Sequence, residues 1–162
     1  MAKSDYFLKL DGIEGESIDD KHSKEIEIGS FSWGVSQLGY GATGGGSGAG
    51  KASVQDLHIT KDVEKSSPNL AKYCANGKHI ATATLTLRKA GEDAQEYVVF
   101  TLSQVLVSSY QISGSGHGGI VPQEQVSLNF QKIQYDYLPQ KGTGSLGGKV
   151  TMSYDAATHK TT

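Results

Sequence analysis

The sequence has a single cysteine, only three prolines and no long apolar run among its 162 residues. One cysteine excludes an internal disulfide framework, because each bridge requires two. No apolar stretch approaches the roughly 20 residues that a membrane-spanning helix needs. The formal net charge is only −2, so there is no surplus of basic residues that would favour nucleic acid as a partner. The N-terminal "MAKSDYFLKLDG" lacks a signal-peptide core, so we expect synthesis and folding in the cytoplasm without a cleaved leader.

Alternation of apolar and polar residues is the main pattern that is present. It runs through "HIATATLTLRK" and "QVSLNFQKIQYDYL", and period two is typical of β-strands. The stretch "EYVVFTLSQVLVSSY" is rich in β-branched and aromatic residues, which also predicts a long strand. Turn-forming segments such as "KAGEDAQ" and "SGSGHGG" separate these runs. We predict roughly eight to ten strands arranged as a barrel or sandwich. The absence of an internal repeat or a linker indicates one domain over residues 1–162.

One predicted strand is apolar on both faces. In "QVSLNFQKIQYDYL", one phase consists of Val126, Leu128 and Phe130, and the other of Ile133, Tyr135 and Tyr137. A bulge near Gln131 would explain the switch. Burial of the second face against another subunit would explain it equally well.

A single helix is expected in "SSPNLAKYCANGK". Ser67 is the predicted N-cap, Pro68 suits the first helical position and Gly77 suits the C-terminal end. The helix should pack on the sheet through one apolar stripe, which consists of Leu70, Tyr73 and Cys74.

The glycine-rich stretch "GGGSGAGKAS", residues 44–53, resembles a phosphate-binding loop. Gly45, Gly50 and Lys51 fit the spacing, but Ala52 stands where a magnesium-binding hydroxyl is required and Ser53 comes one position too late. The flanking residues also lack the strand-before, helix-after context of that motif. We therefore expect no nucleotide cofactor, and interpret the stretch as a long loop between two strands, a kind of loop that is usually functional or disordered.

No other residues form a convincing catalytic or metal-binding pattern. The five histidines are too scattered to predict a metal site, and Cys74 fits a small core residue better than a nucleophile. The neighbours Ser115 and His117 fit a hairpin loop better than a catalytic pair. We interpret the acidic segment around Glu14, Glu16, Asp19 and Asp20 as a solvated loop. We expect neither an enzyme nor a cofactor.

Several segments occur in an order that points to a known family. They include "DGIEGES", "SWGVSQ", "VQDLHITK", "SSPNLAKYCANGKHI" and "VLVSSYQISGSG". With these segments the sequence, from about Tyr6 to Tyr154, closely resembles the haemolysin-coregulated protein family, the tail-tube protein of the type VI secretion system. The resemblance implies a β-barrel flanked by a helix, six subunits in a ring, and rings stacked into a tube. It further implies export by a contractile sheath, a spike protein as partner and effectors carried in the lumen.

The resemblance also suggests roles for individual segments. It implies that residues 39–51 form an extended loop reaching neighbouring subunits or the next ring, through Gly41, Gly44, Gly45, Gly46, Gly48, Gly50 and Lys51. Strand alternation places Ser32 and Ser36 on the small polar side of "SFSWGVSQ", opposite Phe31, Trp33 and Val35. We predict that both serines face the lumen. The polar tail, residues 156–162, departs from the family pattern and has no predicted role.

The main alternative is a monomeric β-barrel that binds a small ligand. It predicts an interior cavity and no concentration-dependent assembly.

Overall fold

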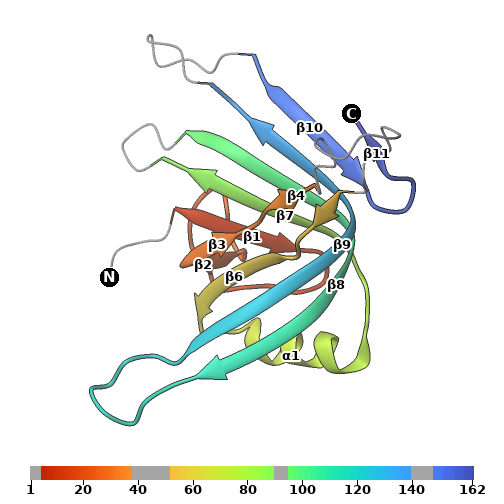
Figure 1. Cartoon of the computed structure of the whole chain (residues 1–162). Coiled ribbons are helices and arrows are strands. Elements are labelled where there is room, and N and C mark those ends of the chain that lie inside the picture. The colour runs from red at the N-terminus through yellow and green to blue at the C-terminus, as the bar shows by residue number, and fades with distance from the viewer. Residues whose placement is uncertain (1–4, 38–51, 90–94, 140–147) are drawn as a thin grey trace.

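The computed structural model describes residues 5–37, 52–89, 95–139 and 148–162 (Figure 1). Within them the fold is mainly β with one helix, as the alternation predicts. The eleven strands exceed the eight to ten expected because three of them have only two residues, too few to leave a periodic pattern. The elements are β1 Tyr6–Leu10, β2 Ile26–Ile28, β3 Ser30–Ser32, β4 Val35–Ser36, β5 Ser53–Val54, β6 Leu57–Asp62, α1 Ser67–Asn76, β7 Ile80–Arg88, β8 Glu96–Ser113, β9 Gln123–Tyr137, β10 Val150–Asp155 and β11 Lys160–Thr161.

A long antiparallel ribbon of β8 and β9 forms the spine of the sheet. Its ladder extends from Val98↔Tyr137 to Ser113↔Gln123. On one side β7 pairs with the first half of β8. On the other side β6 pairs with the first half of β9 and β10 with the second half, so the sheet branches at β9.

The change of apolar phase in β9 has a structural cause within the ribbon. In β9 the buried positions change phase between Phe130 and Ile133, and in β8 between Leu102 and Val105. These residues are paired with each other, so both strands change phase at the same place in the ladder. At this place in β8, Gln104 has a positive φ of 53°. This unusual backbone conformation rotates the ribbon about its long axis, so that the buried side chains before and after it face the same core. The register shift of this ladder lies further along β8, between Val107 and Ser109, so a bulge in β9 near Gln131 is not the explanation.

The sheet is not closed into a barrel, contrary to expectation. Its paired order is β11-β10-β9-β8-β7-β1-β2, with β3 and β6 off this path. The short strands β2 and β3 are separated only by Gly29, yet β2 pairs with β1 and β3 pairs with β6. The two sides of the curved sheet are therefore joined through a bend in the chain, where Gly29 N–H donates to the Thr60 carbonyl at 2.8 Å, and not through a continuous ladder.

Large aliphatic side chains fill the space that the curved sheet encloses. The largest fully buried ones of this core among the described residues are Leu8, Ile26, Ile28, Leu57, Ile59, Leu70, Ile80, Leu85, Leu102, Leu128 and Ile133. This packing gives no support to an interior ligand site of the kind that a monomeric ligand-binding barrel requires.

The ends of α1 match the sequence to within one residue. The N-cap is Ser66, not Ser67, and it makes no side-chain capping bond because its backbone is already helical. Ser67 is the first helical residue, and its hydroxyl instead accepts the Glu64 backbone N–H at 2.9 Å. Pro68 lies in the first turn, and Gly77 ends the helix with a φ of 68°. No helix of the described residues is long and apolar enough to cross a membrane.

The apolar stripe of α1 faces β8 and the core (Figure 1). Leu70 is fully buried, whereas Tyr73 and Cys74 are half-buried and pack on the edge of the core. Leu70 is therefore the main apolar anchor of the helix.

Replacing Leu70 by alanine should lower the free energy of unfolding by about 2–5 kcal/mol, because the side chain is fully buried and leaves a cavity. Urea denaturation of the isolated protein measures this loss. Lys72→Ala, on the exposed side of the same helix, is the matched control and should change stability by less than about 0.5 kcal/mol. A loss below that limit for Leu70→Ala would show that the helix does not depend on this contact.

Candidate functional site

A hollow of about 400 Å³ lies over β3, β6, β8 and β9. None of its lining residues is Asp, Glu, Lys or Arg. The lining residues are Ser30, Phe31, Ser32, His58, Ile59, Thr60, Ser109, Tyr110, Gln111, Gln125, Val126 and Ser127. Their polar members alternate along each strand with side chains that pack in the core, so they project from the opposite side of the sheet.

The strand register arranges these polar residues into two rows. One row crosses four strands as Ser32, His58, Ser127 and Ser109, and the other as Ser30, Thr60, Gln125 and Gln111. We call these eight residues the uncharged face. Neighbours within it are hydrogen-bonded: His58 Nδ1 lies 2.8 Å from Ser127 Oγ, and Ser30 Oγ bonds to Thr60 Oγ1.

The structure separates the two predicted lumen serines. Ser32 is exposed and belongs to the uncharged face, whereas Ser36 is exposed on β4, which pairs with β5 in a separate two-stranded sheet. On the expected apolar side, Phe31 and Trp33 do pack against the core, but Val35 is exposed, because β4 has left the main sheet.

The remaining predicted segments are placed only in part. Residues 39–51, with Gly41, Gly44, Gly45, Gly46, Gly48, Gly50 and Lys51, lie outside the described residues. The polar tail is a turn followed by β11, which pairs with β10 at Tyr154↔Thr161 and Asp155↔Lys160. His159 turns the chain with a φ of 56° and its Nδ1 lies 3.1 Å from the Tyr154 hydroxyl.

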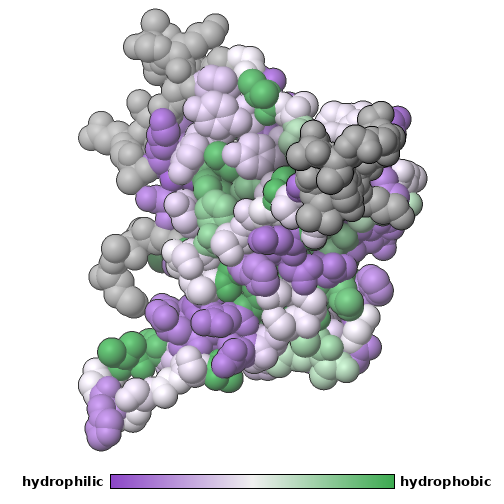
Figure 2. Space-filling model, in the orientation of Figure 1, coloured by the Kyte–Doolittle hydropathy of each residue, from purple (hydrophilic) through white to green (hydrophobic). Residues whose placement is uncertain are grey.

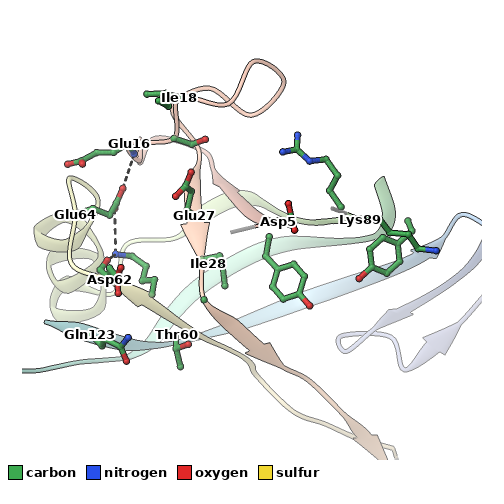
Figure 3. Close-up of a pocket in the computed structure, with 16 residues that line it drawn as sticks. Asp5, Glu16, Ile18, Glu27, Ile28, Thr60, Asp62, Glu64, Lys89 and Gln123 are labelled. Carbon is green, nitrogen blue, oxygen red and sulfur yellow. Dashed lines mark hydrogen bonds and ion pairs between the residues drawn. The ribbon is translucent and has the colours of Figure 1, made fainter. Parts of the chain in front are cut away.

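A second, larger hollow of about 1040 Å³ is lined by charged residues (Figure 3). Glu16, Glu27, Asp62 and Glu64 gather toward one side of it. The Glu16 backbone N–H donates to the Glu64 carboxylate at 2.8 Å, and the Lys65 backbone N–H donates to the Glu16 carboxylate at 2.8 Å. The acidic segment is a loop with Glu14, Glu16 and Asp20 exposed, as predicted, but these hydrogen bonds also hold it to the residues that precede α1.

Two further contacts hold this segment against the sheet. The Arg88 guanidinium donates two hydrogen bonds to the Asp19 carboxylate, at 2.9 and 2.7 Å. These bonds hold the pKa of Asp19 well below its usual range, against the opposing effect of burial. The buried His22 ring stacks on Phe7, and its nitrogens lie 3.0 and 2.8 Å from the carboxylates of Glu25 and Glu96.

A buried ion pair between β6 and β9 was not predicted. Lys61 Nζ lies 2.6 Å from Glu124 Oε2, and both side chains are fully buried. The Tyr110 hydroxyl donates to Glu124 Oε1 at 2.7 Å, and burial together with this carboxylate raises the pKa of Tyr110 to about 12. Strand alternation could have placed both residues on the core side, because Lys61 is in phase with the core residue Ile59, and Glu124 with Val126, but it could not have shown that the two side chains meet.

The Asp19–Arg88 contact makes stability depend on pH. Because the folded pKa is lowered, its stabilising contribution is fully present above the unfolded pKa of about 3.9 and is lost as the pH falls through the folded pKa. Arg88→Met should raise the pKa of Asp19 toward its usual value, as measured by carboxyl ¹³C NMR titration. Lys21→Met, a nearby exposed cation whose side chain is not bonded to Asp19 in the described contacts, should leave that pKa low. An unchanged Asp19 titration in Arg88→Met would contradict this assignment.

Comparisons with known proteins agree with the fold. A family model described as "Type VI secretion system effector, Hcp" matches residues 7–137. The chain is 50% identical to the protein hcp1 of Pseudomonas aeruginosa over 145 residues, which cover 89% of each. It is similar to the crystal structure of Hcp1 from Salmonella typhimurium, with 38% identity, a TM-score of 0.80 and coverage of 99% of this chain and 100% of that one. A type six secretion system protein has 32% identity and a TM-score of 0.91, with the same coverage.

Proposed function

This chain belongs to the Hcp family and is a tube subunit of a type VI secretion system, and we propose that six copies form a ring whose central channel carries effectors. The rings stack into a tube that the contractile apparatus expels. The chain acts as one domain over residues 1–162. Its further partners are the spike protein, the sheath and the effectors, and it is made in the cytoplasm and leaves the cell by type VI secretion.

The uncharged face supports the proposal that the channel carries effectors. A channel for cargo of varied sequence needs a wall that neither repels nor traps one sign of charge. The two rows of hydroxyl, imidazole and amide groups supply donors and acceptors without any formally charged side chain. We therefore assign this face to the lumen, with Ser32 at one end of its row, and place the exposed Ser36 beside it on the channel wall.

The role is structural and not catalytic. The His58–Ser127 pair is the closest approach to a nucleophile and base on the uncharged face. A working pair needs a third group that orients the base. No described contact joins the second ring nitrogen of His58 to a carboxylate, and Ser127 is almost fully buried. The pair therefore fits a cross-strand contact in the channel wall.

Ser32→Gln should leave ring assembly intact and lower the recovery of co-purifying effector by roughly tenfold, because the longer side chain narrows the channel. Tenfold corresponds to a loss of about 1.4 kcal/mol in the free energy of effector binding. Ser32→Ala, which stays small, should recover as much effector as the wild type. The comparison uses rings of equal sedimentation coefficient. Equal effector recovery from Ser32→Gln rings would remove Ser32 from the lumen, and loss of the ring would place it in a subunit contact.

We further propose that the glycine-rich segment, residues 39–51, contacts neighbouring subunits or the next ring. Glycines allow backbone conformations that other residues rarely adopt, so such a segment fits itself readily to another surface. Deleting residues 44–48 should preserve the circular dichroism spectrum and shorten the tubes seen by electron microscopy. Replacing the four glycines of this stretch by serines keeps the length as a control. Unchanged tube length and secretion after the deletion would refute the role.

A further inference from the structure

The hairpin that joins β8 to β9 projects beyond the rest of the sheet (Figure 1). Three of the seven large hydrophobic side chains that are exposed among the described residues lie on it. They are Ile112, Ile120 and Val121, with exposed fractions of 49%, 71% and 44%. Figure 2 shows the corresponding apolar surface on the projecting part of the molecule. We call these three residues the hairpin tip.

The sequence around the hairpin tip lacks formal charge. Residues 111–123 include no Asp, Glu, Lys or Arg, although such residues make up 20% of the chain. Apart from the half-buried Pro122, all of these residues are exposed. Exposed apolar side chains in a stretch depleted of charge are characteristic of the central part of a protein–protein contact.

A second exposed apolar pair lies at the other end of the same ribbon. Tyr137 and Val150 are directly opposite each other in the β9–β10 ladder and are 41% and 62% exposed. Fourteen residue steps along β9 separate Tyr137 from Gln123, a span of about 46 Å at ~3.3 Å per residue. The hairpin tip therefore cannot cover the Tyr137–Val150 pair of its own chain, and each apolar surface is open to another molecule.

We propose that the hairpin tip of one subunit packs on the Tyr137–Val150 pair of the next subunit around the ring. This inference rests on the proposed ring. A closed ring of identical chains uses a head-to-tail contact, in which two different surfaces of each subunit meet. Two apolar surfaces at opposite ends of one ribbon meet this requirement, and every subunit supplies one of each. A second copy of this chain is therefore the occupant of both.

The first test introduces a charge at the hairpin tip of the full-length chain. Ile120→Asp should convert rings to species near the 17.2 kDa of the single chain in sedimentation velocity, because the contact would bury an unpaired carboxylate. Ile120→Val keeps the apolar surface and should keep the ring. Ile18→Asp places the same charge on the large hydrophobic side chain that is most exposed among residues 5–37, 52–89, 95–139 and 148–162, at 85%, and should also keep the ring. Circular dichroism checks that each variant is folded.

Intact Ile120→Asp rings would overturn the contact, as would equal dissociation of the Ile18→Asp and Ile120→Asp rings. These outcomes are separate from a failure of the proposed function, which would appear as a wild-type chain that forms no ring at all.

The second test traps the contact directly. In a Cys74→Ser background, which removes the only cysteine, Ile120→Cys and Val150→Cys are combined and the rings are oxidised. Disulfides form only when the two Cα atoms come within about 7 Å. We expect a ladder of covalent oligomers on a non-reducing gel, and none from either single-cysteine variant. Rings that give no ladder, or tip-to-tip dimers from Ile120→Cys alone, would overturn the head-to-tail contact.

Discussion

The ladder between β8 and β9 is the interaction on which the rest of the fold depends. It is the longest pairing in the described chain, and it offers an edge to β7 on one side and edges to β6 and β10 on the other. The positive φ of Gln104 turns the ribbon partway along its length, so that both halves keep their apolar side toward the same core. Every other long strand is placed by pairing with this ribbon or with a neighbour of it.

Because side chains alternate along each strand, one set of pairings determines both the core and the functional surface. On β6 the core side carries Ile59 and the buried Lys61, and the other side carries His58 and Thr60. The charge of Lys61 is met by Glu124 inside the protein, where removal of one partner would leave the other uncompensated. The same register that makes this buried pair also assembles the two rows of the uncharged face.

Local patterns in the sequence predicted much of this structure. Alternation predicted the long strands, Pro68 and Gly77 predicted the ends of α1 to within one residue, and the ordered motifs predicted the family. Alternation also predicted that Ser32 is exposed. What could not be predicted depends on contacts distant in sequence. Lys61 and Glu124 meet only through the β6–β9 pairing, and Arg88 of β7 binds Asp19, which is 69 residues away. At Gly29 the chain passes from β2, which pairs with β1, to β3, which pairs with β6, so the sheet is not closed by a continuous ladder.

The central claim is that the uncharged face lines a channel at the centre of a ring. A reconstruction of the assembled protein by electron cryo-microscopy tests this claim most directly, because it shows which side of the sheet faces the axis. The account predicts closed rings in which the exposed Ser32, His58 and Ser109 face an open central channel. Rings in which these residues are covered by a neighbouring subunit or face the outer wall would contradict it.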